Sequence, residues 1–227
     1  MARTVNITTH AVRRDAFIDA AEQLFRTKGY EDTSIQDILD ALGVSRGAFY
    51  HYFGSKSELL QAVTDRMVTT ATAAAAPIAF DPDLTAPEKL QGLFRHIQRW
   101  KEGRTDLLLG IIEAWISDEN ALMREKYRRG VAHALIPLLT RIADQGIAEG
   151  TFRATSAEGT ARSIVHLLLA LGDEASQLYV ARQRGLVTYD EVWRVVSTYP
   201  DAVERIAGLS PGSFRVVDED TLRQWFG

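Results

Sequence analysis

The sequence predicts an all-α protein, and three observations support this. Apolar residues recur at helical spacing along nearly the whole chain, no stretch shows convincing β-type alternation, and glycines and prolines divide the chain into segments of helix length. The predicted architecture is an N-terminal three-helix domain over residues 1–54 and a larger helical domain over residues 55–227.

The N-terminal helices follow from apolar stripes and their end signals. A first helix is predicted over residues 10–28, because Phe17, Ala21 and Phe25 share a face and Gly29 then stops the pattern. Ser34 with Asp37 resembles a capping box that opens a second helix. Gly43 should end that helix.

The third and fourth helices are defined in the same way. Ser45 can cap a short third helix in which Phe49 and Phe53 lie on one face, four residues apart. Gly54 closes it, and Ser55 with Glu58 opens a fourth helix to about residue 76, where Pro77 marks a loop.

Six further helices are predicted beyond this loop. Their ranges are 87–102, 105–116, 119–149, 156–184, 189–208 and 219–226. Pro137 should bend the third of these, and Pro200 should break or kink the fifth, because proline lacks the amide hydrogen that a helix interior needs.

Composition limits the class of protein. The chain has 227 residues, 46% of them hydrophobic, which is enough for a substantial core. It has no cysteine, its N-terminus does not read as a signal peptide, and no apolar run reaches the roughly 18 residues of a membrane span. We therefore expect a cytoplasmic protein that has no membrane partner.

Charge is the weakest support for nucleic-acid binding. The net charge of −4 argues against a protein that coats nucleic acid by bulk charge. Basic and acidic residues are also evenly balanced in the N-terminal segment, so a DNA-binding surface would have to come from the placement of charge.

Residues 33–60 read TSIQDILDALGVSRGAFYHYFGSKSELL and predict a helix-turn-helix. Two short helices meet at a tight turn, so that the first braces the second, and the second can enter the major groove of DNA by its N-terminal end. The residues expected to pack inward are Ile38, Leu39, Leu42, Val44, Phe49 and Phe53. The residues left facing outward are Ser45, Arg46, Gly47, Tyr50 and His51.

The outward set suits DNA chemically. Arg46 can pair with a guanine edge or a phosphate, and Tyr50 and His51 can donate hydrogen bonds to phosphate oxygens. Gly47 leaves room for the helix backbone to approach the groove. Lys56, with the amides at the start of the fourth helix, can hold a phosphate.

Packing alone is the alternative interpretation. Short helix pairs with a glycine turn are common in all-α proteins and usually have no DNA to bind. Ser34 and Ser45 can be helix caps only. Tyr52 is expected to be packed rather than to read bases.

Three stretches in unbroken order resemble the tetracycline-repressor (TetR) family. They are AFIDAAEQLFRTKGYEDTS in the first helix, GVSRGAFYHYF across the turn and third helix, and GSKSELL at the start of the fourth. The resemblance covers about the first 65 residues. It implies a homodimeric repressor, a palindromic double-stranded operator and a divergent helical domain for ligand binding and dimerisation. By position, it implies DNA contacts at Ser34, Ser45, Arg46, Gly47, Tyr50, His51 and Lys56.

Polar residues that interrupt apolar helical stretches suggest a ligand cavity in the C-terminal domain. Glu113 and His166 are the proposed polar contacts to a small, mostly apolar effector, since such cavities are largely apolar with a few polar groups. The proposed lining comprises His96, Trp100, Leu107, Trp115 and Tyr127. Alternatively, these polar residues are structural, with Glu113 paired to an arginine and the histidines bonded to backbone carbonyls. The alternative function is a constitutive DNA-binding protein without a ligand.

The predicted helices over residues 156–184 and 189–208 are candidates for the dimer interface. Ala170, Gly172 and Ala175 allow close helix approach, and Leu167, Leu171 and Leu178 supply apolar area. The resemblance favours dimerisation, whereas the residues alone also fit helices that close the core of one chain.

Enzyme function is not expected. The sequence has no P-loop, no GxSxG, no HExxH and no thiol nucleophile, and its five histidines share no metal-ligand spacing. We accordingly expect no catalytic residues, no cofactor and no metal. A pure protein-interaction module is the remaining alternative, and failure to bind any DNA would favour it.

Overall fold

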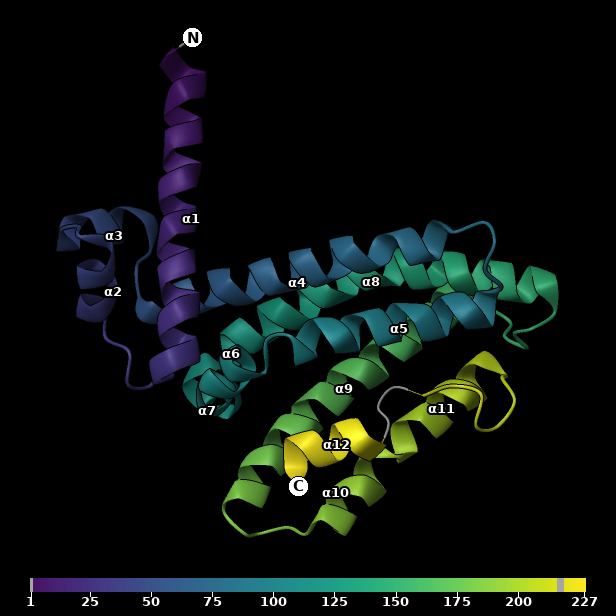
Figure 1. Ribbon diagram of the computed structural model, residues 1–227. Coiled ribbons are helices and arrows are strands. Elements are labelled where there is room, and N and C mark those ends of the chain that lie inside the picture. Colours follow the sequence, from purple (N-terminus) through teal and green to yellow (C-terminus); the bar gives the residue numbers. More distant parts are fainter. Residues whose placement is uncertain (1, 216–218) are drawn as a thin grey trace. The chain divides into compact units, whose positions relative to one another are not determined.

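The computed structural model describes residues 2–215 and 219–227, in which helices are joined by loops and no strand occurs, and this confirms the all-α prediction. Figure 1 shows the order of the helices. Their bounds are α1 Ala2–Lys28, α2 Ile35–Leu42, α3 Arg46–Tyr52, α4 Lys56–Phe80, α5 Ala86–Glu102, α6 Thr105–Gly110, α7 Ile112–Ile116, a 3₁₀ turn at Asp118–Asn120, α8 Ala121–Glu149, α9 Ala157–Gln183, α10 Tyr189–Val196, α11 Thr198–Ala207 and α12 Glu219–Phe226.

The helices pack as two compact units that are each discontinuous in sequence. One unit contains residues 1–67 and 104–127, and the other contains residues 68–103 and 128–227. We call them the N-terminal unit and the C-terminal unit. This division differs from the predicted domains 1–54 and 55–227, because the first part of α4 and all of α6 and α7 pack with the N-terminal helices.

The end of α1 lies against α6 in an unusually close backbone contact. A Cβ atom placed on Gly110 would lie 2.0 Å from the carbonyl oxygen of Phe25, so any residue larger than glycine would force the two helices apart. The amide of Tyr30 donates to the carbonyl of Gly110 over 2.7 Å. This diverted carbonyl coincides with the break between α6 and α7, where the sequence predicted one helix over residues 105–116.

The turn between α2 and α3 forms as predicted. Gly43 adopts a left-handed conformation with φ of 63°, which glycine tolerates without steric cost, and its amide donates back into the last turn of α2. The chain can therefore reverse within two residues and begin α3 at Arg46.

Two proline positions qualify the sequence-based boundaries. The predicted end of the fourth helix near residue 76 is wrong, since α4 continues through Pro77 to Phe80. Pro77 stands in the last turn, where its missing amide removes only one bond, to the carbonyl of Ala73. The predicted break near Pro200 occurs at Ser197, and Pro200 falls in the first turn of α11, where no helical amide bond is needed.

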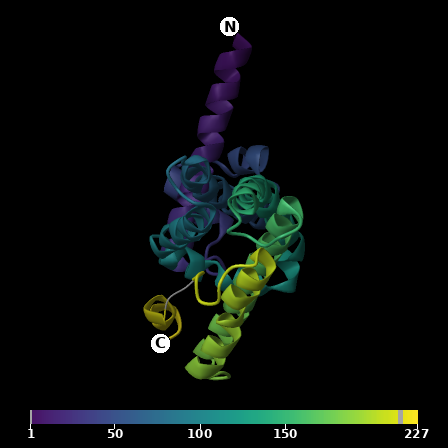
Figure 2. The ribbon, with the colours of Figure 1, turned by 90° about the vertical axis from the view of Figure 1, so that its right-hand side faces the viewer.

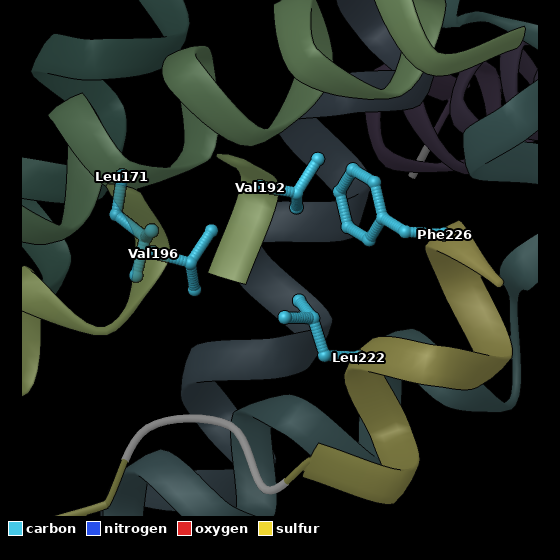
Figure 3. Close-up of a cluster of buried hydrophobic side chains, with 5 residues drawn as sticks. All are labelled: Leu171, Val192, Val196, Leu222 and Phe226. Carbon is cyan, nitrogen blue, oxygen red and sulfur yellow. The ribbon is translucent and has the colours of Figure 1, made fainter. Parts of the chain in front are cut away.

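Side chains from α9, α10 and α12 form an apolar cluster in the C-terminal unit. Figure 3 shows its five buried members, Leu171, Val192, Val196, Leu222 and Phe226. Ala175 and Leu178 pack against the same cluster. Much of the apolar area that the sequence assigned to a dimer interface is thus used within the chain's own core.

Elsewhere in the C-terminal unit, buried polar groups fix the helix ends. The buried carboxylate of Glu204 accepts bonds from the amides of Gly212 and Phe214 and so orders the segment after α11. The buried ammonium of Lys89 donates to Gln145 over 2.6 Å, which ties α5 to α8. Glu204 and Lys89 therefore each have a polar partner, as the burial of a charge requires.

No helix among the described residues is both long enough and apolar enough to cross a membrane.

Candidate nucleic-acid interface

An aromatic cluster anchors α3 to the N-terminal unit. Phe49 and Phe53 are almost fully buried, and both rings lie edge-on to Phe17 of α1, with centroid distances of 5.8 and 6.1 Å. Edge-to-face packing of this kind restrains ring orientation as well as burying area. The inner face of α3 is therefore fixed, and its outer face is held in one direction.

The outer face of α3 carries the predicted DNA-contacting set. Arg46, Gly47, Tyr50 and His51 are exposed, and the Tyr50 side chain is 48% accessible. The Arg46 guanidinium lies 5.8 Å from the centre of the Tyr50 ring, within the range of a cation–π contact. The helix thus presents a cation, an aromatic hydroxyl and an imidazole together.

The predicted burial was wrong for Val44 and correct for Tyr52. Val44 was expected to pack inward, which is wrong, because the tight turn at Gly43 leaves its side chain 37% exposed. Tyr52 is partly buried as expected, and its ring lies 5.6 Å from that of Phe17.

The serines at the helix starts act as caps to different degrees. The Ser34 hydroxyl accepts from the amide of Asp37 and donates to its carboxylate, and this completes the predicted capping box. The hydrogen bonds from Ser34, together with the nearby ammonium of Lys28, hold the pKa of Asp37 well below its usual range. Ser45 occupies the N-cap of α3 without a side-chain capping bond, and its exposed hydroxyl remains available.

Lys56 has a structural role that the sequence did not reveal. Its ammonium donates to the carbonyls of Tyr30 and Thr33, each over 2.9 Å, and lies 4.1 Å above the Tyr30 ring. Burial, with a smaller effect of nearby carboxylates, raises the pKa of Tyr30 to about 12, so the ring beneath the cation stays neutral. Lys56 therefore joins the start of α4 to the loop before α2, and its predicted phosphate contact would compete with these bonds.

The acidic and basic residues of the N-terminal segment, which are equal in number in the sequence, have different surroundings in the structure. On α1, the acidic residues Asp19 and Glu22 both bind the guanidinium of Arg66 in α4, over 2.6 and 2.8 Å. Asp37 is likewise engaged by Lys28 over 2.9 Å. These anions are neutralised within the fold, whereas Arg46 on α3 is exposed.

The predicted effector-binding residues divide between the two units. Leu107, Glu113, Trp115 and Tyr127 belong to the N-terminal unit. Leu107 is buried in α6, and the rings of Trp115 and Tyr127 meet edge-on at 4.7 Å. Burial raises the pKa of the Tyr127 hydroxyl. Glu113 is exposed, contrary to the expectation that a carboxylate in an apolar run is enclosed.

The other three predicted residues belong to the C-terminal unit. His96 and Trp100 are partly buried on α5, whereas His166 is exposed on α9. Lys101, which the sequence did not single out, follows Trp100, and burial lowers the pKa of its ammonium. Only its place beside Trp100 could have drawn attention to it. Among the described residues, no three histidine or carboxylate side chains gather as a metal site would require.

Comparisons with known proteins identify the same N-terminal segment. Residues 17–63 match the profile described as bacterial regulatory proteins, tetR family. An uncharacterized HTH-type transcriptional regulator of Lactococcus lactis is 47% identical over 55 residues, which are 24% of this chain and 28% of the relative. The regulator EthR of Mycolicibacterium smegmatis is 26% identical over 56% of this chain and 66% of its own length. This chain thus spans between about a quarter and two thirds of these curated relatives.

The fold is also similar to solved structures. The crystal structure of RolR in complex with resorcinol has a TM-score of 0.62 at 19% identity, over 90% of this chain and 91% of RolR. The likeness at this identity concerns the fold alone. The relatives are named as transcriptional regulators, in agreement with the expectation that the chain is not an enzyme.

Proposed function

We propose that the chain is a transcriptional repressor of the tetR family that binds double-stranded operator DNA through α3, and the match of residues 17–63 to the model of that family supports this. The observation that carries the proposal is the two-sided character of α3. Phe49 and Phe53 fix one side in the aromatic cluster, while Arg46, Tyr50 and His51 are exposed on the other. A helix with a rigid support and a polar outer face can dock in the major groove without reordering.

The contacts divide by chemistry. Arg46 reads a guanine edge or binds a phosphate, and Tyr50 and His51 donate to phosphate oxygens. Gly47 is exposed between them, so the backbone of α3 can approach the base edges. Ser45 stands at the N-terminus of α3 with a hydroxyl that can donate to a phosphate oxygen, whereas a phosphate contact of Ser34 would compete with its capping bonds to Asp37.

Substitutions on α3 test this proposal. Tyr50→Ala should abolish specific binding with little change in thermal stability, because the side chain is exposed. Arg46→Ala should weaken binding by about 1–3 kcal/mol and relax specificity at one base position if Arg46 reads a base. Arg26→Ala, which removes an exposed cation from the end of α1, is the matched control. Unchanged DNA binding in both α3 variants would refute the assignment.

A homodimer on an inverted-repeat operator is part of the proposal. A two-fold dimer places two copies of α3 in equivalent grooves about 34–36 Å apart, or a multiple of that spacing. The exposed stripe of α9, with Ser163, His166 and Ala170, is one surface on the predicted interface helices that the chain's own core leaves uncovered. A monomer by light scattering at micromolar concentration, with DNA binding retained, would count against dimerisation.

Effector control is the finer part of the proposal. The helix α4 starts in the N-terminal unit and ends in the C-terminal unit, so it can carry a change from an effector site to α3. RolR, of the same fold, was crystallised with resorcinol, and we propose a small, mostly apolar effector here also. Coupling of about 1–3 kcal/mol would weaken operator affinity roughly 5–150-fold, and operator would weaken the effector equally.

Titration of candidate aromatic compounds by calorimetry, with and without operator, tests this coupling. Equal affinities in the two titrations would exclude that compound as the effector. A constitutive DNA-binding protein is the second candidate, and the exposure of Glu113 and His166 favours it, because neither side chain is enclosed as a polar contact in a cavity would be.

A further inference from the structure

The N-terminal part of α1 lies directly against the DNA-facing helix. The ring of His10 lies 5.5 Å from that of His51 and 4.6 Å from that of Tyr52, both on α3. One turn further along α1, the guanidinium of Arg14 lies 5.2 Å from the centre of the Phe53 ring. Two basic side chains of α1 thus contact α3 and the residue that ends it.

His10 and Arg14 continue the buried face of α1 toward its N-terminus. His10, Arg14, Phe17 and Ala21 recur at intervals of three and four residues and so share one face of α1. Phe17 and Ala21 are buried on this face, but toward the N-terminus the same face leaves the core and becomes polar. Arg13 lies beside it and is exposed.

The acidic residues of α1 occupy the opposite face. At about 100° per residue, Asp15, Asp19 and Glu22 fall far from the face of His10 and Arg14. Asp19 and Glu22 are bound by Arg66, and Asp15 is exposed on that same acidic side. The cationic face of α1 is therefore not neutralised by its own helix.

The backbone of α1 continues past the helix-turn-helix. Within the N-terminal unit, α1 runs beside α3 and continues well beyond both α2 and α3, in both views (Figures 1 and 2). The described part of this face, with His10 and Arg14, adjoins His51 at the outer face of α3, so the partner that suits both is the DNA backbone.

We propose that α1 around His10 and Arg13 is a second DNA-binding element, which binds phosphates beside the groove that α3 enters. The inference rests on the proposed function and extends its contact surface. The guanidinium of Arg13 suits bidentate contact with a phosphate, and the ring nitrogen of His10 can donate to a neighbouring one. Such contacts add affinity and set the register of α3, but they read no bases.

The test compares Arg13→Ala with Arg26→Ala in the full-length protein. Both variants remove one exposed arginine of α1, but Arg26 lies near its C-terminal end on the acidic side. The probe is a duplex that the wild-type protein enriches from a random-sequence DNA pool. Affinity is measured from 50 to 200 mM salt, and equal melting temperatures serve as the check on folding.

Each lost phosphate contact lowers the slope of log K against log salt by about 0.9. For Arg13→Ala, the slope should therefore be smaller by about 0.9 per bound protomer. Between 50 and 200 mM salt, the affinity of this variant should then fall by a factor about threefold smaller than the affinity of the wild type. For Arg26→Ala, the slope should equal that of the wild type. Base preference should be unchanged, and His10→Gln should act in the same direction.

The outcomes distinguish the second DNA-binding element from the proposed function. If the wild type enriches no sequence, both the proposed function and the second DNA-binding element are refuted. If it enriches a sequence and Arg13→Ala matches the wild type in affinity and salt slope, only the second DNA-binding element is refuted. If Arg13→Ala changes the preferred bases, α1 reads sequence and the assignment to the phosphate backbone is wrong.

Discussion

Replacing Gly110 by alanine tests how the N-terminal unit is held together. The new Cβ would lie 2.0 Å from the carbonyl oxygen of Phe25 and 3.0 Å from its carbonyl carbon, and both are rigid backbone atoms. The two helices must therefore separate by about 1 Å or more, and overpacking of this kind costs about 1–3 kcal/mol. The bond from the Tyr30 amide to the Gly110 carbonyl would stretch, at a further cost of about 0.5–1.5 kcal/mol.

The sum, about 2–4 kcal/mol, corresponds to a fall in melting temperature of about 5–15 °C for a chain of this size. Circular dichroism at 222 nm during heating and in urea measures it. Gly130→Ala in α8 is the control, because a Cβ there meets no heavy atom within 4 Å. That variant should be neutral or up to about 1 kcal/mol more stable. A Gly110→Ala protein that melts within 2 °C of the wild type would show that α6 does not depend on this backbone contact.

Two further predictions concern α2 and α3. Gly47→Ala has room in the free protein, since the nearest heavy atom is the Ser45 hydroxyl at 4.0 Å, so stability should hold or rise while DNA affinity falls, as measured by melting and by fluorescence anisotropy. Unchanged affinity would mean that the backbone of α3 does not approach the groove at this point. Asp37→Asn should lower the melting temperature at neutral pH, because the depressed pKa of Asp37 means that its ionised form stabilises the fold. That difference should persist down to about pH 4, the ordinary pKa of aspartate, and shrink as the pH falls further; a difference that stayed constant below pH 4 would assign the effect to something other than ionisation.

Features that depend on neighbouring residues were predictable from the sequence. The capping box of Ser34 and Asp37, the left-handed turn at Gly43 and the buried pair Phe49 and Phe53 all formed as expected. Each arises within a few residues, so that spacing and residue type determine it. The exposed face of α3 follows from the same local geometry.

Features that depend on distant segments were not predictable. Gly110 lies in an apolar run that reads as one continuous helix, and only the contact with α1 explains the break after it. The carbonyl partners of Lys56 lie more than 20 residues earlier, so the sequence suggested a phosphate contact instead. Glu113 and His166 looked enclosed because of their apolar neighbours, but helix rotation places both at the surface.

The association of residues 104–127 with the N-terminal helices has a consequence for protein engineering. A chimaera between similar sequences would place its crossover soon after the matching stretch, which ends at residue 63. Here such a crossover would separate Phe25 and Tyr30 from the glycine that α6 provides for them. A workable exchange would transplant two segments together, or retain a glycine at position 110 and the apolar side chain of Leu107 in the recipient.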